Sequence, residues 1–411
     1  MNEQQRRRRM AENYFVIWVD KNINRENKDC QNTLTQLRGV VNQVDICFTA
    51  EQCIQLLNEH RKETSFVISS GTLGQHLVPD IHDMLNLDTI YIFCRNKELH
   101  KAWAKNWTKI KGVHKTINSI CEKLKMDVKQ CDQINLSISI INTTEDGSSE
   151  NVNQLEPSFM YTQIFKEILL CMEHDQQAVK DLVKFCQELY QDNTQELKYI
   201  KEFERNYQPS LALWWYTRQC FTYKMLNRAL RTLDGDIIIR MGFYLCDVHR
   251  QIEQLHKKQV SQYHEESFTV FRGQGLPNEN FEKLEKSKGG LISFNNFLST
   301  SKNRNVSLGF AKDALVGTVD VVGILFQMTI DPSISSTPFA SIRELSDFAQ
   351  EDEILFSMNT IFRIGDIRKI DSNRSLYEVD LKLTSDDDQQ LRRLTDHIRE
   401  ESSGGTGWHR M

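Results

Sequence analysis

The 411-residue sequence lacks a long apolar run, and no stretch approaches the roughly 18 residues of a transmembrane helix. It also lacks the apolar segment of a secretory signal peptide, because residues 1–10 are polar and include four arginines. Neither sign of charge dominates, since 51 lysines and arginines and 56 aspartates and glutamates give a formal net charge of −5. Such a chain has no global field for nucleic acid. We therefore expect a globular, intracellular and cytoplasmic protein that binds neither membranes nor nucleic acid.

The ten cysteines show neither a disulfide framework nor a metal-binding pattern. They lie between positions 30 and 246, and no CxxC motif or Cys/His pair has the spacing of a zinc site. A secreted disulfide scaffold would hardly leave the remainder of the chain without a cysteine. Several of these thiols fall in apolar patterns, where buried cysteines are ordinary core residues. The sequence therefore predicts a reducing compartment and no metal.

The N-terminal part of the chain alternates apolar segments with amphipathic ones. Strands are expected at 15–19, 46–48, 66–68, 90–93 and 136–141, with helices between them. This alternation predicts a doubly wound, flavodoxin- or receiver-like α/β domain over residues 1–141. The third strand ends in Ser69-Ser70-Gly71-Thr72 and offers neither a phosphoacceptor carboxylate nor a complete dinucleotide-binding glycine pattern. We expect a non-catalytic recognition or scaffold domain, followed by a polar linker at 142–156.

Beyond the linker the hydrophobic period becomes helical and later changes to that of strands. Residues 157–265 are expected to form a helical lobe, in which Leu226, Ala229, Leu230 and Leu233 share one face. Residues 266–385 are predicted as a mixed α/β core, and residues 386–411 as a C-terminal helix and tail. The four arginines at 6–9 fit either a solvated terminus or a nuclear or nucleic-acid signal.

Three short motifs in the predicted core contain residues suited to chemistry on a nucleotide. They are Val-Phe-Arg-Gly-Gln at 270–274, Phe-Leu-Ser-Thr-Ser at 297–301 and Gln-Glu-Asp-Glu-Ile-Leu at 350–355. Each alone has an ordinary explanation: an edge arginine, a helix cap and a solvent-facing strand start. In this order, and with Ala-Leu-Trp-Trp-Tyr-Thr at 212–217, they resemble the R-S-E family of arginine-directed mono-ADP-ribosyltransferases, notably the bdelloid-rotifer type. The resemblance covers residues 157–385.

This resemblance implies an ADP-ribosyltransferase fold, with a helical lobe and a split β-sandwich core. It also implies a glycosyltransferase that moves ADP-ribose from NAD to an arginine of a protein acceptor and releases nicotinamide. Enzymes of this kind are also grouped with the nucleotidyltransferases. The sequence does not decide between NAD and NADP as the donor. Two alternatives remain open: an NAD glycohydrolase, and a catalytically silent binding protein in which Arg272, Ser299 and Glu353 do not converge on one cleft.

The two glutamates of the third motif carry the expected chemistry. Glu351 and Glu353 stand two residues apart, so on a strand both side chains emerge from the same face. Carboxylates suit an oxocarbenium-like transition state, and NAD needs no general acid because its leaving group is already cationic. By the family pattern, Glu353 contacts the ribose 2′-hydroxyl and stabilises the developing cation. Glu351 then faces the acceptor guanidinium, which a carboxylate can bind in bidentate fashion.

The other motifs supply the expected donor and acceptor contacts. By the resemblance, Arg272 holds the phosphates of NAD, the Gly273 backbone faces the nicotinamide amide, and Ser299 positions the catalytic glutamate. The remaining donor-side candidates are Thr300, Ser301 and Phe297. Residues 302–304 fit either a phosphate contact or a solvated helix start. The segment 333–347 fits an acceptor-recognition loop or an ordinary connection, and the acceptor-side aromatic candidates are Phe339 and Phe348.

Overall fold

The computed structural model describes residues 14–61, 63–134, 138–141, 159, 162–163, 166, 169–170, 176–218, 220–263, 266–315, 320–333, 337–343, 345, 352–371, 375–385, 388 and 392. The chain divides into two compact units. Unit 1 comprises residues 1–131 and 183–205, and unit 2 comprises residues 132–182 and 206–411. Among the described helices, none combines the length and the apolar character that crossing a membrane requires.

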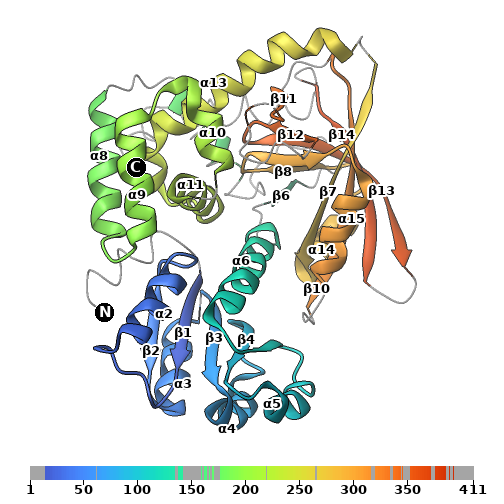
Figure 1. Ribbon diagram of the computed structural model, residues 1–411. Coiled ribbons are helices and arrows are strands. Elements are labelled where there is room, and N and C mark those ends of the chain that lie inside the picture. Colours follow the sequence, from blue (N-terminus) through green and yellow to red (C-terminus); the bar gives the residue numbers. More distant parts are fainter. Residues whose placement is uncertain are drawn as a thin grey trace, which may run out of the picture. The chain divides into compact units, whose positions relative to one another are not determined.

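Unit 1 contains a five-stranded parallel sheet in the order β2-β1-β3-β4-β5, drawn in blue to teal in Figure 1. The strands are β1 Tyr14–Val19, β2 Val44–Cys47, β3 Thr64–Ser70, β4 Leu87–Phe93 and β5 Ile110–His114. All six residues of β1 are buried, because its alternating side chains enter two different cores. Tyr14, Val16 and Trp18 belong to one core, and Phe15 and Ile17 belong to the other.

Helices cover both faces of this sheet. Leucines of α2 (Lys28–Arg38) and α6 (Ile117–Ile134) enter the first core. The second core receives side chains from α3 (Ala50–Glu59), α4 (Gly71–Ile81) and α5 (Lys97–Ala104). Helix α3 begins where the sequence provides a cap, since the Thr49 side chain accepts a hydrogen bond from the Gln52 backbone N–H. The order 2-1-3-4-5 is that of flavodoxin-like open sheets.

The strand expected to close this series belongs elsewhere. Residues Ile138–Ile141 form β6, which pairs in antiparallel fashion with β8 (Leu291–Phe294) in the sheet of unit 2. The prediction that this strand joins the N-terminal parallel sheet is therefore wrong. Its apolar pattern indicates burial in a sheet but carries no information about which sheet, because periodicity specifies faces and not partners. Its hydrogen-bonding partner lies far along the chain, in the register Ile138↔Phe294 to Ile141↔Leu291.

Two long helices follow the undescribed stretches after β6: α8 (Gln176–Leu189) and α9 (Thr194–Asn206). The turn between them is tied to unit 1, because the buried Asn193 side chain donates a hydrogen bond to the Arg38 carbonyl at 2.5 Å. Unit 2 then continues through η2 (Pro209–Leu211), α10 (Ala212–Thr217), α11 (Phe221–Thr232), α12 (Gly235–Arg240), α13 (Gly242–Gln259) and η3 (Val260–Tyr263). Leu226, Ala229 and Leu230 are buried on α11, which confirms the predicted face up to Leu230. Leu233 does not belong to that face, because the helix ends at Thr232 and Leu233 is its C-cap in the left-handed conformation.

The sheet of unit 2 has nine strands in the order β11-β12-β9-β7-β10-β14-β13-β8-β6. Those not yet named are β7 Phe268–Pro277, β9 Leu298–Ser301, β10 Val321–Ile330, β11 Phe339–Ser341, β12 Glu353–Phe356, β13 Thr360–Asp371 and β14 Leu376–Leu383. Of these pairings only β10 with β14 is parallel. Helices α14 (Asn278–Lys286) and α15 (Arg304–Asp313) pack against β7 and β10 (Figure 1).

The long sheet folds back over one apolar core. Phe294 on β8 meets Phe326 on β10 with ring centroids 5.5 Å apart, although two strands separate β8 from β10 in the sheet order. Phe356 on β12 and Phe362 on β13 also meet, at 6.0 Å. One continuous hydrogen-bonded sheet therefore supplies the two facing layers, whereas the sequence suggested a split sandwich. Strands β7 and β9 are joined through a single register pair, Phe271↔Ser301.

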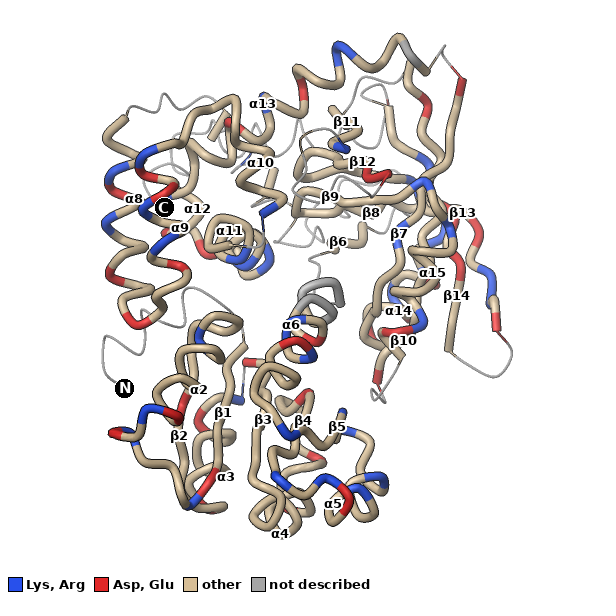
Figure 2. The backbone as a smooth tube through the Cα atoms, viewed as in Figure 1, with Lys and Arg blue, Asp and Glu red and all other residues tan. Residues whose placement is uncertain are grey.

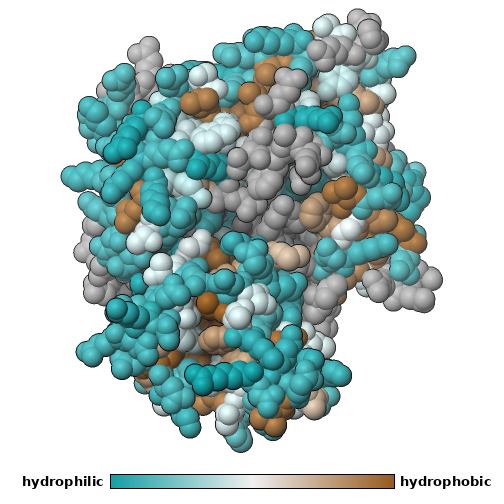
Figure 3. Space-filling view, in the orientation of Figure 1, coloured by the Kyte–Doolittle hydropathy of each residue, from teal (hydrophilic) through white to brown (hydrophobic). Residues whose placement is uncertain are grey.

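Charge and hydropathy are distributed as expected for a water-exposed surface. Strands β13 and β14 carry both signs (Figure 2), and Arg368 pairs there with Glu378 and with Asp380. The face in Figure 3 is mainly hydrophilic, with dispersed apolar positions. Val379, Leu381 and Leu383 are buried on β14 while Lys382 is exposed, so this strand has one buried face and one face toward water.

Candidate functional site

The three motifs lie on three adjacent strands of unit 2. Arg272 is on β7, Ser299 is on β9 and Glu353 begins β12, and the sheet order places β9 between the other two. Glu353 stands opposite Ser301 in the antiparallel ladder, and Ser301 in turn stands opposite Phe271. Segments that are far apart in the sequence are thereby brought to one place by strand register.

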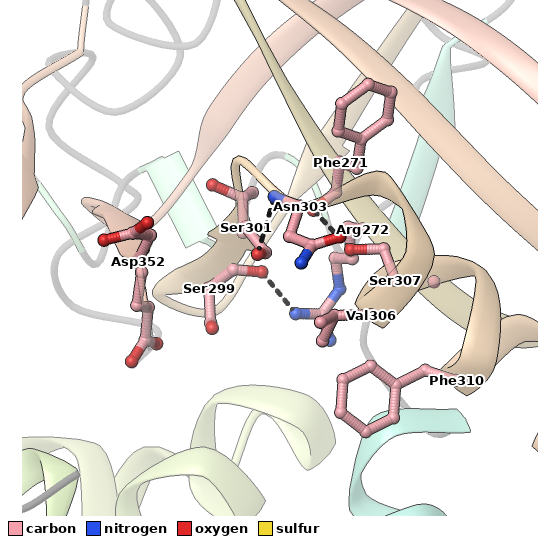
Figure 4. A pocket seen from close by; sticks show the side chains of 12 residues that line it. Phe271, Arg272, Ser299, Ser301, Asn303, Val306, Ser307, Phe310 and Asp352 are labelled. Carbon is pink, nitrogen blue, oxygen red and sulfur yellow. Dashed lines mark hydrogen bonds between the residues drawn. The ribbon is translucent and has the colours of Figure 1, made fainter. Parts of the chain in front are cut away.

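A pocket of about 180 Å³ opens at this junction. It is lined by Phe271, Arg272, Gly273, Ser299, Thr300, Ser301, Asn303, Val306, Ser307, Phe310, Asp352 and Glu353. Figure 4 shows Arg272 directed toward Ser299, with Val306 and Phe310 beside it. The pocket therefore has a wall of sheet and a wall of helix, with the cation between them.

Arg272 is half-buried and holds a fixed position. Its Nε donates to the Gln274 side-chain oxygen at 3.0 Å, and its Nη1 donates to the Ser299 carbonyl at 2.7 Å. Burial lowers the pKa of Arg272 to about 10, against the opposing influence of Tyr223, Tyr216 and Glu353. Among the described residues no carboxylate lies within ion-pairing distance of Arg272, and its Nη2 has no hydrogen-bond partner. Such a cation is suited to an anionic ligand.

Gly273 is required by the close approach of α15. A Cβ atom built on Gly273 would lie 1.6 Å from the Ser307 carbonyl oxygen and 2.9 Å from the Ala311 backbone nitrogen. The Ser307 hydroxyl also donates to the Phe271 carbonyl at 3.0 Å, which joins α15 to β7 beside the pocket. The absence of a side chain at 273 therefore allows the helix wall of the pocket to approach the sheet.

The three residues Ser-Thr-Ser at 299–301 point alternately to the two faces of β9 and have different roles. Thr300 is 3% exposed, and its hydroxyl donates to the Ile354 carbonyl at 2.8 Å, which ties β9 to β12. Ser301 accepts a hydrogen bond from the Asn303 backbone N–H at 3.0 Å, and Asn303 in turn caps α15. The Ser299 hydroxyl has no hydrogen-bond partner among the described residues. It is therefore available to a ligand or to an incoming side chain.

Aromatic residues of the helical segment lie close to these charges. Burial raises the pKa of Tyr216 well above its usual range, with Glu353 adding to that shift and Arg272 opposing it. The Tyr216 hydroxyl donates to the Asn227 side chain at 3.1 Å. Tyr216 also packs edge-on against Phe297, with ring centroids 5.3 Å apart. Glu353 and Arg272 are thus near enough to the Tyr216 hydroxyl to shift its pKa in opposite directions.

Comparison with known families finds a match over the part of the chain that contains the pocket. The family model described as ADP-ribosyltransferase exoenzyme, for enzymes that transfer ADP-ribose from NAD, matches slightly less than half of the chain. Residues 190–386 match that family. We call them the exoenzyme region. It contains Arg272, Ser299 and Glu353, together with all the other residues that line the pocket.

Solved structures similar to this chain include ADP-ribosyltransferase toxins. The C3 exoenzyme of Clostridium limosum is 16% identical, with 43% of this chain and 84% of that chain covered and a TM-score of 0.32. Plx2a of Paenibacillus larvae is 18% identical, with 46% of this chain and 95% of that chain covered and a TM-score of 0.32. The Vis toxin of Vibrio splendidus is 19% identical, with 53% of this chain and 91% of that chain covered and a TM-score of 0.30. Similarity at this level does not determine the acceptor. No curated protein matches the chain.

Some predicted residues lie away from the pocket or outside the described residues. Phe297 is 3% exposed and does not line the pocket, since it packs behind it against Tyr216. Phe339 is 1% exposed and packs in the core against His256, Tyr263, Phe268 and Phe356. Glu351 and Phe348 lie outside the described residues. Across the described residues, no three His, Cys, Asp or Glu side chains are placed to hold a metal ion.

The helix wall of the exoenzyme region was not foreseen. Val306, Ser307 and Phe310 line the pocket, and the sequence pattern indicated only that a helix could follow Ser301. The signal that could have identified this wall is Gly273 in the interior of β7, because a strand glycine often marks the close approach of another backbone. Asp352 also lines the pocket and pairs with Arg343 at 3.1 Å.

Proposed function

We propose that the exoenzyme region cleaves NAD in the Arg272–Ser299–Glu353 pocket and transfers ADP-ribose to an arginine side chain of a protein. The observation that supports this most directly is the convergence of these three residues, from three strands, on one pocket. A silent binding protein in its simplest form predicts that they do not converge. The R-S-E subtype and the arginine acceptor belong to this proposal.

Arg272 would bind the diphosphate of NAD. Its guanidinium is held by the Ser299 carbonyl and the Gln274 side chain, so it keeps its direction without being neutralised by them. Two N–H groups on Nη2 remain for phosphate oxygens, and such charge-assisted bonds are about twice as strong as neutral ones. Burial disfavours the charged form of Arg272 and lowers its pKa, and a bound anion would stabilise that charged form.

Glu353 would stabilise the positive charge that develops on the ribose. The bond between ribose C1′ and the nicotinamide nitrogen breaks, and its electron pair remains on the nicotinamide, which leaves as a neutral molecule. A guanidinium nitrogen then forms the new bond to C1′ and loses one proton. A fixed carboxylate beside the ribose lowers the energy of this oxocarbenium-like transition state. The free Ser299 hydroxyl can hydrogen-bond to that carboxylate or to the ribose.

The acceptor side of the proposal rests on Glu351, by the family pattern. This carboxylate would orient the guanidinium and accept its proton late, because free guanidinium has a pKa above about 12. Unit 1 supplies none of the described pocket residues. We propose a recognition or scaffold role for it.

The test uses purified full-length chain, NAD labelled in the ADP-ribose and agmatine as a small guanidinium acceptor. Label on agmatine in the wild type, lost in Glu351→Gln while nicotinamide release persists, would support arginine transfer. Nicotinamide release without labelled agmatine in the wild type would replace this proposal with an NAD glycohydrolase. An absence of nicotinamide release from folded wild-type protein would refute both.

A further inference from the structure

An arginine of the chain itself is bonded to a residue that lines the pocket. The Arg343 Nη1 donates to the Asp352 Oδ1 at 3.1 Å, and Asp352 lines the pocket together with its neighbour Glu353. The Arg343 side chain is 61% exposed, so it is not packed into the protein. A site proposed to modify arginine therefore has an arginine within one hydrogen bond of its wall.

Backbone pairing brings this arginine to the pocket. Strand β11 pairs in antiparallel fashion with β12, and directly after β11 the Ile342 backbone N–H donates to the Glu353 carbonyl at 3.2 Å. Continuing this register by one residue on each strand places Arg343 opposite Asp352, where cross-strand side chains are close enough to interact. The position of Arg343 therefore rests on backbone hydrogen bonds as well as on its exposed ion pair.

The bond to Asp352 leaves part of the guanidinium free to react. The Nη1 of Arg343 is held by the carboxylate, while its Nη2 has no hydrogen-bond partner among the described residues. A carboxylate orients a guanidinium through the planar arrangement of its N–H groups, and the proposed mechanism requires such orientation on the acceptor side. Asp352 can therefore hold Arg343 beside the ribose that Glu353 is proposed to contact.

Two other arginines of the exoenzyme region bind carboxylates outside the pocket. Arg368 is 48% exposed and pairs with Glu378 and Asp380 on β14. Arg304, at the start of α15, donates to Glu378 at 2.6 Å. Neither of these carboxylates lines the pocket. Arg343 differs from both arginines because its partner does.

We propose that Arg343 is an acceptor for the protein's own reaction, so that the chain ADP-ribosylates itself at this residue. The inference rests on the proposed function. In this step the bond between ribose C1′ and the nicotinamide nitrogen breaks, and its electron pair leaves with nicotinamide. A terminal nitrogen of Arg343 forms the new bond to C1′ and releases one proton to water. The reaction is intramolecular, because Arg343 and the pocket belong to one chain.

The experiment incubates the purified full-length chain with NAD labelled in the ADP-ribose, in one reaction with agmatine and in another without added acceptor. In the second reaction, label on the chain is counted and located by peptide mass spectrometry. We expect label on the wild type at Arg343 and its loss in Arg343→Lys, because a lysine amine lacks the planar group that a carboxylate orients. Diluting the wild type should leave the fraction labelled per unit time unchanged, as an intramolecular reaction requires.

Two control variants separate this reaction from other causes of labelling. Arg368→Lys makes the same substitution at an exposed arginine that is also paired with carboxylates, and it should keep the wild-type label. Glu353→Gln should carry no label, because the enzymatic reaction needs the carboxylate proposed to stabilise the ribose cation. Arg343→Lys should still label agmatine, which shows that this variant is folded and active.

Labelled agmatine without label on the wild-type chain, or with label only at residues other than Arg343, would overturn the inference and leave the proposed function intact. Equal label on Glu353→Gln and on the wild type would also overturn it, because the attachment would then be non-enzymatic. So would a labelled fraction that rises with protein concentration, which indicates transfer between copies. If the wild type does not label agmatine, the proposed function itself fails, and that result precedes any measurement on the chain.

Discussion

Replacing Gly273 with alanine should move α15 away from β7 and slow NAD cleavage about a hundredfold. The added Cβ would lie 1.6 Å from the Ser307 carbonyl oxygen, where real contacts stay beyond 3.0 Å. Its next neighbours are the Ser307 carbonyl carbon at 2.7 Å and the Ala311 nitrogen at 2.9 Å. All three are backbone atoms of one helix, so no side-chain rotation can relieve the conflict.

The helix must therefore shift by on the order of 1–2 Å, and a misplacement of about 1 Å can cost about a hundredfold in rate. Overpacking of this kind costs typically about 1–3 kcal/mol, and a clash with backbone belongs at the upper end. With about 2–4 °C lost per kcal/mol, we expect the melting temperature to fall by about 10 °C. Nicotinamide release should fall by about two orders of magnitude, because Val306, Ser307 and Phe310 move with the helix.

Gly309 on the same helix provides the control. A Cβ on Gly309 meets no atom within 4 Å, so Gly309→Ala should keep full activity. It should also stabilise the protein slightly, because glycine inside a helix costs about 0.5–1 kcal/mol relative to alanine. Thermal melting and nicotinamide release measured on both variants decide the matter. A Gly273→Ala protein with wild-type melting and wild-type activity would refute the account of the pocket wall.

Two further predictions concern titratable groups. Arg272→Met should abolish the stabilisation of the protein by NAD, which in the wild type would be about 2.7 kcal/mol at a hundredfold excess of NAD over its Kd. The melting temperature without NAD should stay the same or rise, because a buried cation has been removed. An increase of the melting temperature of this variant on addition of NAD would contradict the phosphate role of Arg272. Burial, with Lys166 adding to it, lowers the pKa of His249 from 6.5 to about 4, so its contribution to stability is complete above pH 6.5 and is lost as the pH falls toward 4. His249→Gln should therefore flatten the decline of melting temperature between pH 6.5 and 4, and an unchanged slope would count against this assignment.

The sequence predicted those parts of the fold that depend on local periodicity. The strands of unit 1 follow from short apolar runs and the buried face of α11 follows from a 3.6-residue period, and both signals are visible in a short window. The destination of β6 was wrong, because Ile138 pairs with Phe294, which is distant in the sequence, and periodicity does not name partners. The continuity of the nine-stranded sheet was missed for the same reason.

At the site, the sequence identified the residues with distinctive chemistry and missed those that shape the pocket. Arg272, Ser299 and Glu353 carry charge or a hydroxyl within an ordered set of motifs. Val306 and Phe310 contribute shape alone, and such side chains resemble any helix residue.

The central claim is that the Arg272–Ser299–Glu353 pocket breaks the bond between ribose and nicotinamide. Its most direct test is the rate of nicotinamide release from NAD by the full-length wild type, by Glu353→Gln and by Glu279→Gln, an exposed carboxylate at the start of α14. The account predicts release by the wild type and by Glu279→Gln, and a loss of about two to three orders of magnitude in Glu353→Gln, as for removal of one charge-stabilising group. Release by Glu353→Gln at the wild-type rate, with all three proteins folded, would contradict it.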